Sequence, residues 1–234
     1  FGVRLIGGDT TQSPHLTLSV TALGWIETGK AIPRSGAQVD DLIVVSGTVG
    51  DAAFGLQHLG HPLQKRLDYP TPRCELGEML KGLASSMIDV SDGLAQDLGH
   101  ILKASNVGAK IDLSLIPIDD ALKGLAEQEQ WKYALAGGDD YELCFTLPAH
   151  LLDAVQADAG RQQLAVTVVG QMLPRQAAQT QVQFRLHDQP FELQQTGFQH
   201  FAYAQYIRTS QSQASLTTDT NLARRGSTLG IFGG

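Results

Sequence analysis

The stretch SMIDVSDGLAQDLGHIL, residues 86–102, constrains the fold of this chain more than any other part of it. It opens with the apolar residues of a short predicted strand and then places Asp89, Ser91 and Asp92 directly before Gly93. The apolar residues that follow recur at i, i+4, i+7 and i+8, which is the spacing of one helix face. The sequence therefore predicts a strand that passes into a helix through a short acidic turn.

This acidic turn has the chemistry of a metal-assisted phosphate site. Free N–H groups at a helix N-terminus attract anions, but the carboxylates of Asp89 and Asp92 repel a bare phosphate. A bound Mg²⁺ would offset this repulsion, because it takes oxygen ligands and is commonly shared between carboxylates and substrate phosphates. A simpler interpretation stays open, in which Ser91 or Asp92 only caps the helix, since Ser and Asp are among the commonest caps.

Composition bounds the classes of function. The net charge of −7 provides no basic surface for nucleic acid or an anionic membrane. No apolar run approaches the ~20 residues that a membrane-spanning helix requires. Cys74 and Cys144 form no CxxC motif and are typical of the reduced thiols of an intracellular protein, so we expect a cytoplasmic location. A chain of 234 residues suffices for one or two domains.

Other patterns alternate between strands and helices. Residues 16–22 alternate apolar and polar side chains, which predicts a half-buried strand. The continuous apolar run 42–45 predicts a strand buried on both faces, followed by a glycine turn and a helix that Asp51 can cap and that runs to about Gly60. Residues 61–72 read as a proline-broken loop. Further strands are predicted over 109–113, 143–147, 165–169 and 182–186, and helices over 75–85, 131–136 and 150–159. A short helix capped by Asp119 or Asp120 is predicted as well.

Two further loops carry candidate binding residues. Arg34 follows Pro33 on a loop, where a guanidinium can hold a phosphate by two bonds, although an ordinary surface arginine is an equally good interpretation. Residues 24–31 nearly match the phosphate-binding pattern GxxxxGK[ST], but Ala31 lacks the required hydroxyl, so we reject a P-loop. The acidic pair that starts at Asp139 follows a Gly-Gly turn and is either part of a site or a pair of solvated turn residues.

Six segments follow one another along the chain: GGD (7–9), RSGA (34–37), SGTVGDAAFGL (46–56), IDVSDGL (88–94), GGDDYELCF (137–145) and GFQHF (197–201). Taken together in this order, they closely resemble thiamine-monophosphate kinases, a family within the superfamily of aminoimidazole ribonucleotide synthetase. IDVSDG is shared across the superfamily, whereas GGDDYELCF and GFxHF are more specific to the kinases. The family often has Glu at position 139, where this chain has the shorter Asp.

The resemblance covers residues 1 to about 203 and implies an α/β (α+β) fold. Residues 29–203 would form a C-terminal mixed-sheet α/β domain of the aminoimidazole ribonucleotide synthetase type. Residues 1–28 would be the last strands of an N-terminal ATP- and Mg²⁺-binding domain, most of which is expected upstream of this chain. Residues 204–234 are expected to be a disordered tail, because they are rich in Ser, Thr and Gln without apolar periodicity.

The resemblance also implies the activity. ATP would phosphorylate thiamine monophosphate to thiamine diphosphate by direct in-line transfer, a step of thiamine biosynthesis. The accepting phosphate has a second pKa of ~6 and is largely ionised at neutral pH, so no catalytic side chain is expected and Mg²⁺ and Arg neutralise the charge. By the resemblance, Mg²⁺ (several ions) would be held by Asp9, Asp89 and Asp92, ATP by Gly8, Asp9, Arg34 and Ser91, and thiamine phosphate by Asp139 and Phe198.

The expected partners are ATP and thiamine monophosphate, with no nucleic acid and no membrane. A homodimer is expected through the N-terminal domain. Two other interpretations remain open. One is another ATP-using enzyme of the superfamily, such as selenophosphate synthetase; the other is a fragment without catalytic activity.

Overall fold

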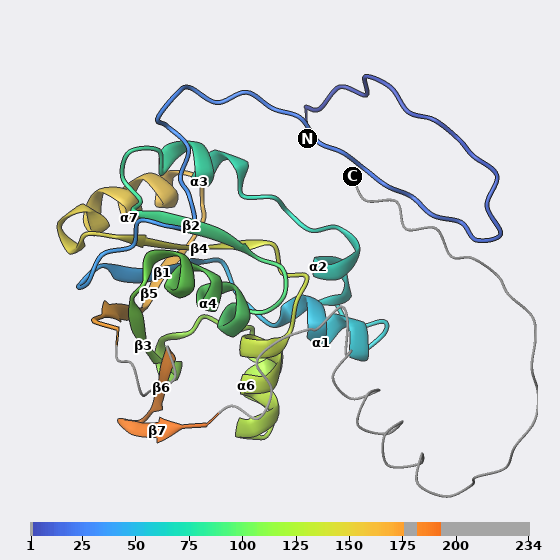
Figure 1. The fold of residues 1–234 in the computed structure, drawn as a ribbon. Coiled ribbons are helices and arrows are strands. Elements are labelled where there is room, and N and C mark those ends of the chain that lie inside the picture. The colour runs from blue at the N-terminus through green and yellow to red at the C-terminus, as the bar shows by residue number, and fades with distance from the viewer. Residues whose placement is uncertain (1, 176–181, 193–234) are drawn as a thin grey trace, which may run out of the picture.

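A computed structural model describes residues 2–175 and 182–192 (Figure 1). Its strands form one seven-stranded sheet in the order β2-β4-β1-β5-β3-β6-β7. The strands are β1 (Leu42–Ser46), β2 (Ser86–Val90), β3 (Gly108–Asp112), β4 (Glu142–Leu147), β5 (Val166–Leu173), β6 (Val182–Leu186) and β7 (Gln189–Phe191). The helices are α1 (Asp51–Gln57), α2 (Gln64–Asp68), α3 (Cys74–Met79), α4 (Leu94–Ser105), α5 (Asp120–Lys123), α6 (Glu127–Ala136) and α7 (Leu152–Arg161), with 3-10 turns at Leu113–Leu115 and Ala149–Leu151.

The sheet is mixed, as expected. Strands β3 and β6 pair in parallel, and the other neighbours pair antiparallel. Because β1 and β2 both pair antiparallel with β4, they run in the same direction. Both therefore end at the edge of the sheet where β4 begins, and the loops after them meet there.

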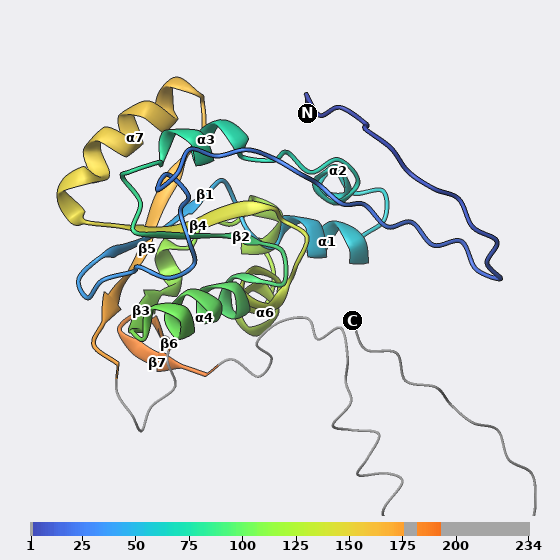
Figure 2. The same ribbon diagram turned by 45° about the horizontal axis from the view of Figure 1, so that its top comes forward.

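Helices cover both faces of the sheet. Figures 1 and 2 show α3 and α7 on one face and α4 and α6 on the other. Neighbouring strand residues point to opposite faces, so Val44 packs in the cluster with Phe145 and Leu76, whereas Val45 packs in the cluster with Leu98 and Trp131. The prediction that residues 42–45 form a strand buried on both faces is confirmed.

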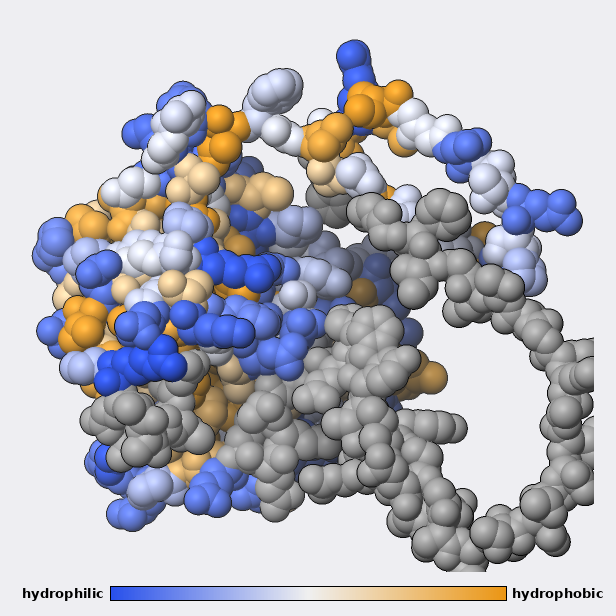
Figure 3. Space-filling model, viewed as in Figure 1, coloured by the Kyte–Doolittle hydropathy of each residue, from blue (hydrophilic) through white to orange (hydrophobic). Residues whose placement is uncertain are grey.

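The predicted strand at residues 16–22 is wrong. The structure gives this segment no secondary structure, and Leu16, Leu18 and Val20 are 91%, 84% and 91% exposed. Figures 1 and 2 show the segment as part of an N-terminal arm that runs away from the sheet, and Figure 3 shows hydrophobic residues, in orange, on the visible part of this arm. A strand needs a neighbour for its backbone N–H and C=O groups, and none of the described strands pairs with this segment.

Smaller corrections concern element boundaries. The predicted loop 61–72 contains α2, and the helix predicted over 75–85 ends at Met79. Strand β2 continues to Val90, so Asp89 lies within the strand and not after it. The other predicted elements are present with shifts of a few residues at their ends, and β7 was not predicted. The short helix that Asp119 or Asp120 was expected to cap is α5, where the side chain of Asp119 accepts the N–H of Ala121 at 2.9 Å.

The remaining expectations concern the C-terminal residues, membrane-spanning helices and the two cysteines. Residues 204–234 and Phe198 lie outside the described residues. In the described part, no helix is both long enough and apolar enough to cross a membrane. Both cysteines are free, with Cys74 exposed and Cys144 buried.

Candidate functional site

The acidic residues singled out in the sequence meet where β2 ends and β4 begins. The N–H of Asp139 donates to the carbonyl of Ser91 at 2.9 Å, and the N–H of Tyr141 donates to the carbonyl of Val90, also at 2.9 Å. A Cβ at Gly138 would collide with the carbonyl oxygen of Ser91, so glycine is required for this approach. Segments far apart in the chain are thereby placed side by side.

Asp97 on α4 fixes the turn that follows β2. Its Oδ2 accepts hydrogen bonds from the N–H groups of Ser91 and Asp92, both at 3.0 Å. The N-cap residue of α4 is Gly93, and no side chain caps the helix there. The interpretation of Ser91 or Asp92 as a helix cap is therefore wrong, and Asp92 instead accepts a bond from the side chain of Gln96 at 3.1 Å.

Negative charge is concentrated at this edge. Burial raises the pKa of Asp97 to about 6, the two backbone bonds oppose the shift, and the carboxylates of Asp92 and Asp89 add to it. The pKa of Tyr141 is raised by burial and then by Asp139, Asp89 and Asp92. These carboxylates thus share one electrostatic environment, which favours a cation. An all-oxygen donor set of this kind fits Mg²⁺.

Arg34 lies near one of these carboxylates, that of Asp89. It lines a cavity of about 460 Å³ together with Asp89 and Met87. Its loop is attached to the free edge of β2, because the N–H of Met87 donates to the carbonyl of Pro33 at 3.1 Å. A second cavity of about 510 Å³ shares Asp89 and Met87. It is also lined by Arg73 and Tyr141 and by uncharged residues: Pro70, Pro72, Cys74, Gly77 and Leu143.

Three predicted site residues are not brought to this edge by the described structure. Gly8 and Asp9 lie in the exposed segment that precedes the sheet, where Asp9 accepts a bond from the N–H of its neighbour Thr10 at 2.7 Å. Phe198 lies outside the described residues. The structure does bring together Asp89, Ser91, Asp92 and Asp139, with Arg34 on the wall of the adjoining cavity.

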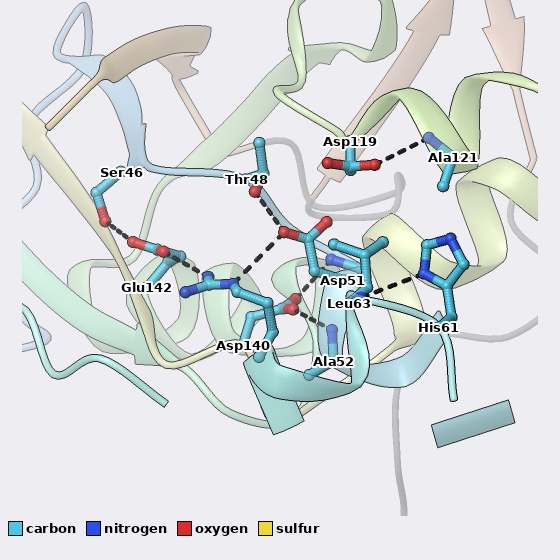
Figure 4. Close-up of polar contacts among 12 residues, drawn as sticks. Ser46, Thr48, Asp51, Ala52, His61, Leu63, Asp119, Ala121, Asp140 and Glu142 are labelled. Atoms are coloured by element: carbon cyan, nitrogen blue, oxygen red, sulfur yellow. Dashed lines mark hydrogen bonds and ion pairs between the residues drawn. The ribbon is translucent and has the colours of Figure 1, made fainter. Parts of the chain in front are cut away.

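Sequence reasoning missed a buried ionic network at the start of β4. Glu142 is fully buried and accepts a hydrogen bond from Ser46 Oγ at 2.6 Å (Figure 4). It also accepts bonds from Arg66 Nη2 at 2.6 Å and Arg73 Nε at 2.7 Å. The sequence did contain a signal for this burial. Glu142 lies two residues before Cys144, which is buried, and residues at i and i+2 of a strand point to the same face of the sheet.

Asp140 has a second, separate role in the same region. Its two carboxylate oxygens accept the N–H groups of Gly50 at 2.6 Å and Ala52 at 3.1 Å, so it caps α1 from a distant segment (Figure 4). The sequence had suggested that Asp51 itself could cap this helix; instead Asp51 faces Thr48 and Arg66. Asp140 is completely buried, so it is not a solvated turn residue.

Fold and site together define a mixed-sheet α/β domain with an acidic edge and an adjoining arginine. Residues 38–183 match the family model of the AIR synthase related protein, C-terminal domain. The chain therefore belongs to this family, and the fold class expected from the motifs is confirmed.

Particular relatives support the narrower resemblance. The thiamine-monophosphate kinase of Escherichia coli K12 is 44% identical over 214 residues, which covers 86% of this chain and 65% of that protein. The crystal structure of thiamine-monophosphate kinase from Stenotrophomonas maltophilia K279a is 38% identical, with a TM-score of 0.63 over 71% of this chain and 56% of the other. A structure of AaThiL complexed with AMPPCP and TMP is 28% identical, with a TM-score of 0.57 over 73% and 54%. The chain thus spans less than two thirds of the length of these relatives.

Proposed function

We propose that this chain supplies the C-terminal domain of a thiamine-monophosphate kinase, which transfers the γ-phosphoryl group of ATP to thiamine monophosphate and forms thiamine diphosphate. The observation that carries the proposal is the convergence of Asp89, Ser91, Asp92 and Asp139 beside Arg34. The names of the relatives and the AMPPCP and TMP of the AaThiL structure support the same activity. The proposed domains are 1–28, 29–203 and a tail from 204, and the proposed location is cytoplasmic.

Each residue at this edge has a role that suits phosphoryl transfer. Asp89 and Asp92 would hold Mg²⁺, which supplies charge neutralisation for the phosphates when it is bound. Arg34 would donate N–H groups to phosphate oxygens of ATP, and Ser91 would contact ATP. Asp139 would contact the thiamine phosphate. No proton needs to be removed from the attacking phosphate, so no general base is assigned.

The remaining assignments depend on parts that lie away from this edge. Gly8 and Asp9 would contribute to ATP and Mg²⁺ binding if the segment that carries them approaches the acidic edge. Phe198 would stack on the thiamine phosphate. We propose a homodimer formed through the N-terminal domain, as the resemblance to the kinase family implies.

The proposal is tested by replacing Asp89 with Asn in a fusion. The part of the E. coli kinase that precedes the matched region is joined ahead of this chain, and thiamine diphosphate formation from ATP, thiamine monophosphate and Mg²⁺ is followed by ³¹P NMR. Asp89→Asn is expected to lower kcat by about a hundredfold or more, because one carboxylate of the cation site is lost. The control is Asp120→Asn, at a side chain that is 93% exposed and pairs only with Lys123 among the described residues.

The outcomes separate the alternatives. Turnover by the fusion but not by the chain alone would mean that the chain is a catalytically incomplete part of a kinase, an interpretation favoured by its uncovered segment 2–28. A folded fusion without turnover would contradict the kinase proposal and would direct attention to another ATP-using enzyme of the superfamily. Full activity of Asp89→Asn would contradict the metal role alone.

A further inference from the structure

A cluster of mixed metal-ligating side chains lies at the start of α4. Asp92, Asp97 and His100 each offer one ligand atom, and these atoms all lie within 4.8 Å of one another. We propose that this cluster binds a divalent first-row transition metal, with Zn²⁺ bound more tightly than Mg²⁺. The proposal goes beyond the kinase activity, because it concerns a different class of metal. It also depends on Asp97 and His100, which the proposed mechanism does not use.

The backbone places the three ligands on one side of a rigid element. Asp97 and His100 are three residues apart on α4, so their side chains are neighbours on one helix face. Asp92 lies in the turn just before the helix, and its N–H is held by Asp97 at 3.0 Å. A pair of ligands at i and i+3 with a third from the preceding turn requires no rearrangement of the chain.

Asp97 is prepared for a ligand role by its own hydrogen bonds. Among the described residues, Asp97 accepts hydrogen bonds from Ser91 and Asp92, and both end on Oδ2. Oδ1 is therefore left for a cation, while the N–H groups fix the orientation of the carboxylate, as outer-shell bonds do around metal ligands. The side chain is only 2% exposed, and an ionised carboxylate this deeply buried is costly without a positive partner.

The histidine determines which metals suit the cluster. Mg²⁺ takes oxygen ligands and keeps several waters, whereas an imidazole with two carboxylates suits Zn²⁺ and its neighbours. Three protein ligands leave an open position on a tetrahedral ion, and His100 is exposed, so solvent can reach that position. Because Asp92 also belongs to the proposed Mg²⁺ set, Zn²⁺ and Mg²⁺ should compete for it.

The test measures metal binding and not catalysis, so its failure is distinct from failure of the kinase proposal. ZnCl₂ is titrated calorimetrically into the metal-free chain carrying Cys74→Ser, because the exposed thiol of Cys74 is an alternative zinc ligand. His100→Gln is expected to weaken Zn²⁺ binding at least tenfold, about the loss expected when one group of a metal site is removed. The same variant should leave Mg²⁺ affinity unchanged within about twofold, because imidazole is not a ligand that Mg²⁺ prefers.

Two further variants make the result specific. His150→Gln, at an exposed histidine on the 3-10 turn before α7, should bind Zn²⁺ like the parent. Asp97→Asn can keep both backbone bonds through its amide oxygen but loses the charge, and it should weaken Zn²⁺ binding while circular dichroism shows an intact fold. Unchanged Zn²⁺ affinity in His100→Gln, or Zn²⁺ binding no tighter than Mg²⁺ binding in the parent, would overturn the proposal.

Discussion

Asp140 and Glu142 are separated by one residue, yet their buried charges are satisfied in different ways. Asp140 accepts two backbone N–H groups at the start of α1, whereas Glu142 accepts bonds from Arg66, Arg73 and Ser46. Removing one partner from such a buried arrangement leaves an uncompensated charge, which costs about 3–5 kcal/mol. Both residues therefore hold the loops around the acidic edge without belonging to it.

Asp140 predicts a pH dependence of stability. Burial raises its pKa to about 7, against the opposing hydrogen bonds from Gly50 and Ala52. The folded chain then binds this proton more tightly than the unfolded chain, whose carboxyl has an ordinary pKa of 3.8. The contribution of Asp140 to stability is therefore present below about pH 4 and is lost as the pH rises to about 7.

Urea unfolding of the wild type and Asp140→Asn across this range isolates the effect. The amide of the variant has one acceptor oxygen for two N–H donors, so the variant carries a cost that does not depend on pH. The free energy of unfolding of the wild type minus that of the variant should fall between pH 4 and 7 and stay level above. A difference that is flat, or that rises with pH, would show that the buried carboxyl is not held at a raised pKa.

Among the elements, the turn from β1 to α1 depends on glycine at position 47. Gly47 has a φ of +57°, and a Cβ there would lie within 2.8 Å of both carboxylate oxygens of Glu142. Those oxygens cannot move away without breaking their bonds to Arg66 and Arg73. The bonded position of the Glu142 carboxylate therefore leaves room only for glycine at position 47 of the turn.

Gly47→Ala should lower the free energy of unfolding by more than about 2 kcal/mol, because left-handed strain adds to the collision with Glu142. The matched control is Gly99→Ala within α4, where a Cβ would meet nothing within 4 Å. That change should raise stability by about 0.5–1 kcal/mol, the cost of glycine in a helix interior. Thermal or urea unfolding measures both, and similar effects for the two variants would contradict this account of the turn.

Elements with a strong local pattern were predictable from the sequence. The apolar run of β1 and the helical period of α4 were both predicted, because burial imposes these periods directly. The acidic turn of residues 89–92 was also recognised as a site candidate. The contacts of Asp97 and Glu142 were not predicted, because their partners are backbone N–H groups of a folded turn and arginines 69 and 76 residues away. Such partners exist only once the sheet has assembled.

At the scale of the whole molecule, residues 16–22 show where a local pattern is insufficient. Their alternation resembles that of a sheet strand, but the sheet of the described residues ends at β2 on one side, where the Pro33 loop bonds to the strand edge, and at β7 on the other. The apolar side chains of the segment are left exposed. A segment with this pattern is suited to pairing with a strand that the described residues do not supply.

This arrangement predicts the order in which a protease cuts the chain. Within residues 2–175 and 182–192, chymotrypsin at low concentration should cleave first near Leu16, Leu18 and Trp25, which are 91%, 84% and 104% exposed. Cleavage at buried Trp131 or Phe145 requires opening of the sheet and should be at least about a hundredfold slower.

The N-termini of the early fragments that contain the sheet, determined by mass spectrometry, should fall within residues 2–31, and these fragments should keep the circular dichroism of the intact sheet. Acrylamide quenching gives an independent check, since Trp25 should be quenched freely and Trp131, 4% exposed, should be protected. If residues 16–22 are paired with a partner strand in the fusion with the E. coli segment, both chymotrypsin cleavage near Trp25 and acrylamide quenching of Trp25 should decrease there. Resistance of residues 16–26 in the isolated chain, equal to that of the sheet, would mean that this segment is already paired and that the domain begins before residue 29.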